Sequence, residues 1–276
     1  MALKALLCDA AKTAAGRIHV LGGWGSHRLQ GPRKGVSGAI AGVVLDVPAD
    51  RVGKQLRIGA RLGTIRGVDS RSWRAVKAGG RPVQAQRSVT VPPGGGGGPA
   101  NVPFVLELPL VDLARERYAW KLSSAGGGAL LPFYDNFGQG DVDPLPDGNL
   151  FLCDAATVAD EQLFMIGARA EPVLAPEDTA RWGLAGRMSK PTDNGSGFER
   201  VEVKAELRGP GGTSVTSVKQ EVEVRRPEGP RSDWAPVEVP IAIELPQTKL
   251  EPGDYAWSVD AGDLFEYVEF TVGGSA

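Results

Sequence analysis

Two blocks of sequence from the first half of the chain recur in the second half, in the same order. Positions 7–11 read Leu-Cys-Asp-Ala-Ala, and the same five residues stand 145 positions later, at 152–156. The second block begins with Val-Pro at positions 102–109 and has a counterpart 137 positions later, at 239–246. Because both blocks keep their order with a modest change of offset, we interpret the chain as a tandem duplication with drift in loop length.

The alignment of the two copies gives the expected domain boundaries. Residues 138–148 consist mostly of turn-forming residues and have little to bury, so they are predicted to be a linker. We therefore expect one domain over residues 1–137 and a second over residues 149–276. A run of five glycines between Pro92 and Pro99 falls inside the first copy, so we predict a long loop there.

The matched segments alternate between apolar and polar residues, with apolar side chains at every second position of residues 102–108 and 239–245. Residues 55–62, 201–208 and 221–225 alternate in the same way, and a period of two is typical of a half-buried β-strand. The 38 glycines and 21 prolines suit short strands joined by turns better than helices. With about seven strands per copy, we predict an all-β fold of two tandem antiparallel immunoglobulin-like β-sandwich domains, with a small barrel as the alternative.

The segment 250–257 carries the most detailed structural prediction. Pro252 and Gly253 favour a tight turn, and Tyr255 opens the strand that follows it. A tyrosine after such a turn resembles the tyrosine corner of immunoglobulin-like sandwiches. The first copy keeps the tyrosine, as Tyr118, but has Arg-Glu in place of Pro-Gly, so its corner is less clearly indicated.

Charge and hydropathy narrow the classes of partner. The chain has 31 Lys and Arg residues against 33 Asp and Glu residues, and this balance gives no reason to expect nucleic acid or an anionic membrane. The mildly apolar start meets Asp9 too soon for the core of a signal peptide, and no stretch approaches the about 20 apolar residues of a membrane span. We expect a soluble protein made in the cytoplasm, which could leave the cell by lysis or inside a larger particle.

The residues that most often carry chemistry are few. Cys8 and Cys153 occupy the same place in the two copies, and we interpret them as small apolar core residues rather than as a disulfide or reactive thiols. His19 stands where the second copy has Phe164, which favours a packing role, and His27 is expected at the surface. The second half has no histidine, so a histidine-based catalytic or zinc site would have to lie in the first domain.

Carboxylates offer the remaining alternatives for a chemical site. Asp9 and Asp154, shared by the two copies, are expected to bond neighbouring backbone amides rather than act as general bases. Asp141, Asp143 and Asp147 cluster in the linker, but their spacing does not match the calcium-binding EF-hand loop, which favours a solvated linker. The sequence therefore indicates no catalytic residue, no cofactor and no metal.

Four tryptophans lie outside the matched strand positions: Trp24, Trp73, Trp182 and Trp234. Exposed tryptophans on loops are frequent contact residues in interfaces, so these four are the candidate contact residues. The alternative is that each is simply buried.

The motifs together resemble those of a family of uncharacterised domains. They are the Leu-Leu-Cys-Asp-Ala-Ala strand, a strand ending in Leu-Gly-Gly-Trp at 21–24, the Val-Pro strand and the closing Tyr-x-Trp. The family they resemble is a domain of unknown function from actinobacteria and their phages, and the resemblance covers most of both halves. The second copy departs from it with Gly-Ala-Arg at 167–169. The resemblance implies a fold and no established activity, so it transfers no functional residue.

These observations favour a non-enzymatic structural or interaction protein over an enzyme. We expect a component or decorating protein of a larger assembly, such as the capsid or tail of a phage virion, that binds protein through loops and strand edges. The bound protein would be a second copy or another component of the assembly. The alternative is a soluble protein that binds a small molecule or a carbohydrate through aromatic side chains, with two copies giving avidity.

Overall fold

The structure is a computed structural model of the 276-residue chain. The residues that it describes are 2–23, 33–64, 73–94, 97–113, 117–125, 127–134, 149–159, 162–169, 173–174, 182–190, 198–225, 237–262 and 264–273. The chain divides into two compact units, unit 1 (Met1–Leu145) and unit 2 (Pro146–Ala276). The predicted linker and its aspartates lie outside the described residues, so the predicted domain boundaries and the calcium hypothesis stay untested.

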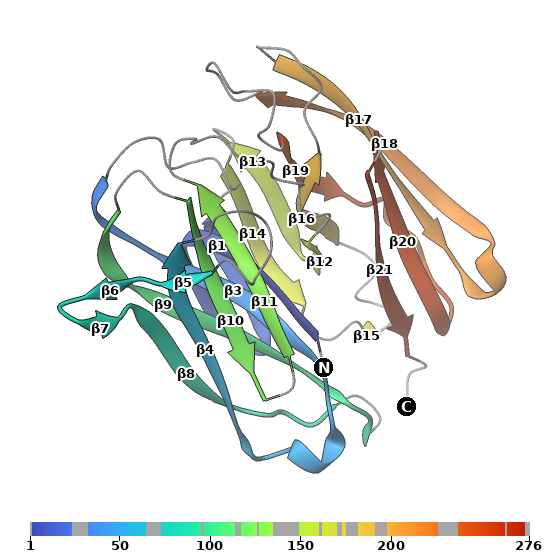
Figure 1. The fold of residues 1–276 in the computed structure, drawn as a ribbon. Helices are drawn as coiled ribbons and strands as arrows, with labels where there is room; N and C mark the ends of the chain where they lie inside the picture. Colours follow the sequence, from blue (N-terminus) through green and yellow to red (C-terminus); the bar gives the residue numbers. More distant parts are fainter. Residues whose placement is uncertain are drawn as a thin grey trace. The chain divides into compact units, whose positions relative to one another are not determined.

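Unit 1 consists of two antiparallel sheets (Figure 1). The first sheet has the order β2-β1-β3-β9, with bounds β1 (Ala2–Ala14), β2 (Arg17–Gly23), β3 (Arg33–Val47) and β9 (Ala100–Leu113). The second sheet has the order β11-β10-β4-β8, with bounds β4 (Gln55–Thr64), β8 (Gln84–Thr90), β10 (Arg117–Ser124) and β11 (Gly127–Tyr134). Three short strands, β5 (Arg74–Ala75), β6 (Lys77–Ala78) and β7 (Arg81–Pro82), precede β8, and β5 pairs with the end of β4.

Unit 2 repeats this arrangement of strands. One sheet has the order β12-β16-β19, with bounds β12 (Asn149–Cys153), β16 (Gly183–Lys190) and β19 (Val237–Glu244), and β13 (Ala155–Ala159) and β14 (Gln162–Arg169) form a hairpin after β12. The other has the order β21-β20-β17-β18, with bounds β17 (Phe198–Arg208), β18 (Ser214–Arg225), β20 (Gly253–Ala261) and β21 (Leu264–Val272). The short β15 (Val173–Leu174) adds to β21 in parallel.

Strands that hold the same place along the chain therefore have the same neighbours in the sheets of both units. The sheet β1-β3-β9 corresponds to β12-β16-β19, and β11-β10-β4-β8 corresponds to β21-β20-β17-β18. Two facing antiparallel sheets with these connections form an immunoglobulin-like β-sandwich, so the predicted fold class is confirmed. The predicted strands are also found, since β4 begins at Gln55 and β17 covers residues 201–208.

Alternation along each strand separates an inner face from an outer face. On β4, Leu56, Ile58, Ala60 and Leu62 are buried in the core, whereas Gln55, Arg57 and Arg61 are exposed. On β17, Val203, Ala205 and Leu207 are buried, and the residues between them are partly exposed. Successive side chains of a strand point to opposite faces, so the pattern of the sequence places these inner residues directly.

Each unit has its own core between its two sheets. In unit 1, Phe104 from one sheet and Leu62, Trp120 and Leu122 from the other belong to one buried cluster. In unit 2, the indole of Trp182 packs edge-on against Trp257 at 5.8 Å and against Phe270 at 5.1 Å between ring centroids. Edge-to-face aromatic pairs contribute beyond the area that they bury, so these rings fix the packing of the unit 2 core.

The tyrosine corner predicted for unit 2 is present. The Tyr255 hydroxyl donates a hydrogen bond of 2.9 Å to the backbone carbonyl of Glu251, four residues earlier in the chain. The Tyr255 ring is largely buried and stacks on Phe270 at 5.6 Å between ring centroids. The bond thus ties the incoming loop to the start of β20. In unit 1, Tyr118 is buried at the start of β10, which holds the corresponding place in its sheet.

Removing the hydroxyl of Tyr255 tests the corner. We expect Tyr255→Phe to lower the free energy of unfolding by about 1–2 kcal/mol, because the Glu251 carbonyl loses its donor while the ring stays packed. Urea titration followed by tryptophan fluorescence measures this. The matched control is Tyr267→Phe, which removes a hydroxyl from an exposed tyrosine of the neighbouring strand and should change stability by less than about 0.5 kcal/mol. Equal losses in the two variants would contradict the corner.

Candidate functional site

The four candidate tryptophans have different outcomes in the structure. Trp24 and Trp234 lie outside the described residues. Trp182 is 2% exposed, and its indole nitrogen donates to the Pro246 carbonyl at 3.3 Å, so the prediction of a contact residue is wrong there. It was misassigned because it precedes β16 rather than falling in a matched strand, yet its ring fills the core. Trp73 is half-buried on the outer face of a sheet.

Trp73 lies over the outer face of the unit 1 sheet β11-β10-β4-β8. A Cβ placed on Gly63 of β4 would stand 2.2 Å from the indole, so this position accepts only glycine while the ring is there. The indole nitrogen lies 3.4 Å from the Ala119 carbonyl of β10, and the Lys121 ammonium lies 5.6 Å from the ring centroid. An ammonium within about 6 Å of an aromatic face is a cation–π contact, so Trp73 helps to position Lys121.

Cationic and amide side chains surround Trp73 on this outer face. Arg57 and Arg61 point outward from β4, and the outward residues of β8 are Gln84, Gln86, Ser88 and Thr90. Gln55 donates to Thr90 at 2.9 Å, and Arg57 donates to Gln86, so two cross-strand hydrogen bonds order the face. Arg61 and Lys121 are direct cross-strand neighbours and both are exposed. We call the surface formed by Arg57, Arg61, Lys121 and Trp73 the basic face.

The basic face stands in a region without described acidic residues. Across the described residues between 53 and 91, and again between 117 and 131, the chain has no Asp or Glu. The exposed Arg74, Lys77 and Arg81 of β5 to β7 lie in the same stretch. In the described part of the chain, no carboxylate forms an ion pair with Arg57, Arg61 or Lys121. The positive charge of this face is therefore presented to solvent.

Charge divides unequally between the two units, which the net charge of the whole chain hides. Residues 1–145 contain 19 Lys and Arg against 10 Asp and Glu, whereas residues 146–276 contain 12 against 23. Unit 1 is thus formally +9 and unit 2 is −11. The near-neutral balance of the whole chain is therefore absent from each unit taken singly, and the predicted absence of a nucleic-acid partner stays untested. Counting charge in each predicted domain would have found this feature.

The corresponding outer face of unit 2 carries ion pairs on β17 and β18. Lys219 forms an ion pair with Glu202 at 3.0 Å. Glu206 forms ion pairs with Lys204 at 3.5 Å and with Arg208 at 3.6 Å. The pKa of Glu206 lies below its ordinary value because the Ser214 hydroxyl bonds its carboxylate, with smaller contributions from Arg208 and Lys204, against an opposing effect of desolvation. Lys204, Arg208 and Lys219 are therefore engaged in ion pairs within β17 and β18.

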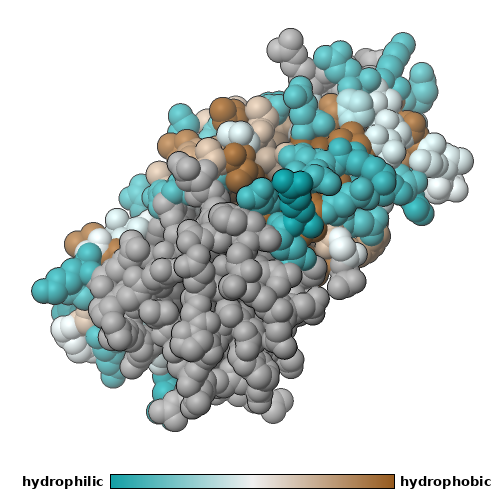
Figure 2. Space-filling view, turned by 90° about the horizontal axis from the view of Figure 1, so that it is seen from above, coloured by the Kyte–Doolittle hydropathy of each residue, from teal (hydrophilic) through white to brown (hydrophobic). Residues whose placement is uncertain are grey.

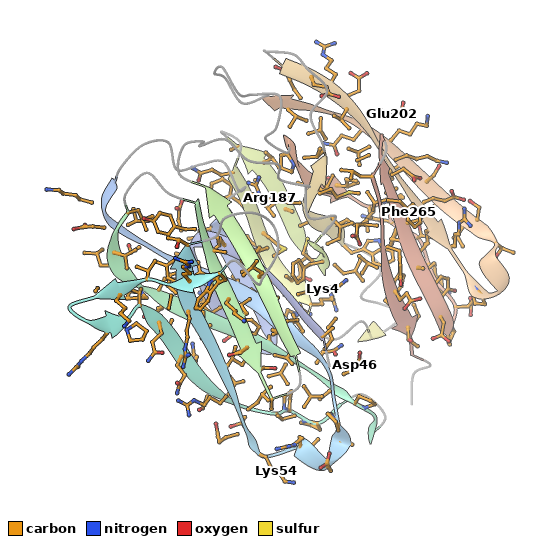
Figure 3. All side chains as sticks on the ribbon, in the orientation of Figure 1. Lys4, Asp46, Lys54, Arg187, Glu202 and Phe265 are labelled. Atoms are coloured by element: carbon orange, nitrogen blue, oxygen red, sulfur yellow. The ribbon has the colours of Figure 1, made fainter. Side chains whose placement is uncertain are left out.

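The other half of that face, on β20 and β21, has acidic and aromatic side chains. The residues of these two strands include no Lys or Arg. Phe265, labelled in Figure 3, is 61% exposed and Tyr267 is 54% exposed. They stand two residues apart in the same phase of β21, and therefore on the same side of the strand. Asp260 is the cross-strand partner of Phe265, and Ser258 is that of Tyr267. We call the surface formed by Asp254, Asp260, Phe265, Tyr267 and Glu269 the acidic strip.

Phe265 and Tyr267 are site residues that the sequence interpretation did not single out. Their signal is present, because they share the phase of Glu269 and Thr271, whereas Phe270 and Val272 occupy the buried phase. Two aromatic residues in the solvent-facing phase of a strand are candidates for contact with a ligand or partner. In the view of Figure 2, patches of apolar groups lie beside hydrophilic groups on the described part of the surface.

The carboxylate of Asp154 bonds an arginine, a partner that the sequence interpretation did not foresee. Arg169 of β14 approaches the Asp154 carboxylate at 3.2 Å, and the arginine side chain is only 10% exposed. Two observations require glycine at position 167. A Cβ there would lie 2.0 Å from this carboxylate, and the backbone φ of 69° is one that residues with a side chain rarely adopt. Gly22, its counterpart in the first copy, has a φ of 63°. Asp9, the counterpart of Asp154, is exposed on β1.

The two cysteines are buried and unpaired, as predicted. Burial raises the pKa of Cys8 and of Cys153 to about 12, and the neighbouring Asp9 and Asp154 contribute in the same direction. The Cys8 thiol lies 3.4 Å from the Ala39 carbonyl. Both thiols are therefore protonated near neutral pH and are poor nucleophiles. His19 and Phe164 are each half-buried at corresponding places on β2 and β14, whereas His27 lies outside the described residues.

The described ranges bring no three His, Cys, Asp or Glu side chains together in a group able to hold a metal ion. They also include no helix of the length and apolarity that a membrane span requires.

Comparison with known proteins adds likenesses to solved structures only. No family model matches the chain, and no curated protein matches it. β-Glucuronidase 2 of Bacteroides uniformis, bound to cyclophellitol-6-carboxylate aziridine, is 13% identical over 87% of this chain and 26% of that one, with a TM-score of 0.27. The BSP domain of a biofilm associated protein is 11% identical over 98% and 51%, with a TM-score of 0.20. Extracellular domains 3–5 of Drosophila OTK are 9% identical over 98% and 100%, with a TM-score of 0.18.

This chain spans about a quarter of the length of that glucuronidase and about half of the length of the biofilm protein chain. TM-scores of 0.27 and below do not establish a shared fold. The assignment of the fold therefore rests on the strand order and on the tyrosine corner.

Burial of the thiols makes a prediction for their reactivity. At pH 8 a pKa of about 12 leaves roughly one thiol in 10⁴ ionised, so we expect the folded chain to react with Ellman's reagent over hours rather than seconds. In guanidinium chloride two thiols per chain should react at once. Cys8→Ala should halve that number and leave the folded chain equally slow. A thiol that reacts in the folded chain within the first minute would contradict the burial.

Proposed function

We propose that this chain is a non-enzymatic interaction protein, and that it serves as a component or decorating protein of a larger assembly such as a phage capsid or tail. The observation that carries the proposal is the outer face of the four-stranded sheet in each unit. Each face exposes charged side chains on regular strands whose other side is fixed in a core, with the half-buried Trp73 over the unit 1 face and the exposed Phe265 and Tyr267 on the unit 2 face. Rigid faces of this kind suit contact with a protein surface better than capture of a small molecule in a pocket.

The proposal that the chain has no catalytic activity is supported by the state of its reactive groups. Both thiols are buried and protonated near neutral pH, and Asp154 is neutralised by Arg169. An enzyme of acyl or glycosyl transfer would need a nucleophile or an acid beside a base and an orienting group. We propose instead that these side chains stabilise the fold.

The origin and setting of the chain belong to the same proposal. Equal strand order in the two units supports an origin by duplication, and the motifs support membership of the actinobacterial and phage family that they resemble. Synthesis in the cytoplasm, where virions assemble, fits this role. Partners would be proteins, including further copies of this chain, and neither nucleic acid nor a membrane is invoked.

Fractionation of particles tests the assembly role. If the chain is a virion component, gradient-purified particles from the organism that encodes it should contain the chain in a fixed ratio to the major capsid or tail protein, as measured by quantitative mass spectrometry. The ratio should persist through a second gradient, while an abundant soluble protein of the same lysate is removed. A chain found only in the soluble fraction would overturn the assembly role.

The exposed pair Phe265 and Tyr267 favours a second candidate function, the binding of a carbohydrate. Aromatic faces beside a carboxylate, here that of Asp260, can stack on sugar rings and bond their hydroxyls. If this candidate holds, a glycan array should yield a ligand for the full chain, and Phe265→Ser with Tyr267→Ser should weaken binding at least about tenfold. The control Leu110→Ser removes an exposed apolar residue of unit 1 and should leave binding unchanged. An array without a ligand would exclude the candidate.

A further inference from the structure

We propose that copies of this chain associate head to tail, with the basic face of unit 1 in one copy bound to the acidic strip of unit 2 in the next. This inference deepens the proposed assembly function and rests on it. The two surfaces occupy equivalent sheets of the two units, yet they differ in charge and chemistry in a complementary way. Apart from the half-buried Trp73 and Asp260, the residues of both surfaces are exposed within a single copy, so each surface is available to a second one.

The basic face offers the groups that recognise carboxylates. Arg57 and Arg61 are exposed on β4, and Lys121 is exposed beside Arg61 on β10. A guanidinium binds a carboxylate through two parallel hydrogen bonds and also stacks on aromatic rings. No described carboxylate of the same copy neutralises these three cations. The positive charges of Arg57, Arg61 and Lys121 are therefore available to carboxylates of a partner.

The acidic strip offers the groups that an arginine-rich surface binds. Asp260 and Glu269 supply carboxylates from β20 and β21, and no Lys or Arg occurs in either strand. Lys204, the cross-strand neighbour of Asp260, is already paired with Glu206. Phe265 lies directly opposite Asp260, and Tyr267 lies between Phe265 and Glu269 on β21; both aromatic residues are more than half exposed. Guanidinium groups stack on aromatic faces better than ammonium groups do, so this aromatic pair favours a partner surface that presents arginines, as the basic face does.

The spacing of the groups is compatible with direct pairing. Arg57 and Arg61 are four residues apart on β4, and Phe265 and Glu269 are four residues apart on β21. At a rise of about 3.3 Å per residue, both separations are about 13 Å. One of the two arginines can therefore stack on Phe265 of the next copy while the other pairs with Glu269 of that copy. Adjacent strands are about 4.8 Å apart, which brings Lys121 and Asp260 within reach of the same contact.

The acidic strip is what favours a second copy over a polyanion as the occupant of the basic face. A phosphate or sulfate chain would use unit 1 alone, and it would leave two exposed aromatic residues and the excess of acid on unit 2 without a role. A contact between two different surfaces of the same chain is heterologous. It leaves one basic face and one acidic strip free at the ends of every pair, so association continues into a ring or an open chain.

Sedimentation velocity of the full chain tests this inference. At concentrations up to roughly 100 μM and about 0.02 M NaCl, the weight-average sedimentation coefficient should rise with concentration, since contacts of this kind have dissociation constants in the micromolar range. In about 1 M NaCl the Debye length falls to about 3 Å, and the chain should sediment as a monomer. A monomer at every concentration and salt level would overturn the inference.

Two charge-reversed variants locate the surfaces. Arg57→Glu with Arg61→Glu reverses the basic face, and Asp260→Lys with Glu269→Lys reverses the acidic strip. Each should raise the apparent dissociation constant at least about tenfold when alone. An equimolar mixture of the two should associate again, because the unchanged face of each meets the unchanged face of the other and the reversed faces are also complementary. Two variants that each still associate alone, or a mixture that stays monomeric although both variants are folded by circular dichroism, would overturn the assignment.

Matched variants separate the contact from general charge effects. Lys12→Glu with Lys34→Glu makes the same change of charge on exposed positions of β1 and β3, in the other sheet of unit 1, and should leave association unchanged. Phe265→Ser with Tyr267→Ser keeps the charge and should weaken association at least about threefold. If reversal of the acidic strip unfolds unit 2, this uncharged pair still tests it. Equal loss in the control at β1 and β3 would contradict the proposed surfaces.

A polyanion is the competing outcome, and it has its own measurement. Binding of heparin or duplex DNA to the full chain is measured for this purpose. A polyanion would replace the second copy as the occupant if the Arg57 and Arg61 variant loses this binding, the Asp260 and Glu269 variant keeps it, and the chain does not self-associate. The particle fractionation does not depend on which surface is used. A chain that is monomeric in solution yet fixed in particles would refute self-association alone, whereas a chain absent from particles would refute the assembly role.

Discussion

The two-residue alternation of the strands is the constraint on which the rest of the structure depends. Every strand of the four-stranded sheets gives one set of side chains to a core, as Leu56, Ile58 and Leu62 show on β4. The intervening set must then face away from that core, whatever its chemistry. Because the inner set holds the sheets together through burial, the outer set can change without altering the strand order.

Corresponding positions in the two units show this division directly. Trp120 and Trp257 are both buried in the middle of their cores, on β10 and β20. The outward residues beside them differ, since Lys121 of β10 stands where Ser258 stands on β20, and Arg61 of β4 stands where Glu206 stands on β17. The inner positions therefore carry the common fold, and the outer positions carry the difference in charge between the units.

Most of the fold could be predicted from the sequence, whereas most of the candidate surfaces could not. The strands and the corner at Tyr255 follow from local patterns, namely a period of two and a turn before a tyrosine. The place of Trp182 in the core and of Trp73 over Gly63 depends on residues far away in the chain, and no local pattern reports it. The opposite charges of the units were legible in the sequence, but averaging over the whole chain removed them.

The cross-strand pair of Arg61 and Lys121 links stability to the proposed contact. Like charges directly opposite one another on a sheet are destabilising, and no described carboxylate forms an ion pair with either residue. Trp73 offsets part of the repulsion by holding the Lys121 ammonium near its ring. A carboxylate from a second copy would remove more of it, so the repulsion already present in the free chain adds to the driving force for association. Salt weakens both the repulsion and the contact, and for that reason the free chain should gain stability under the same conditions in which the assembly dissociates.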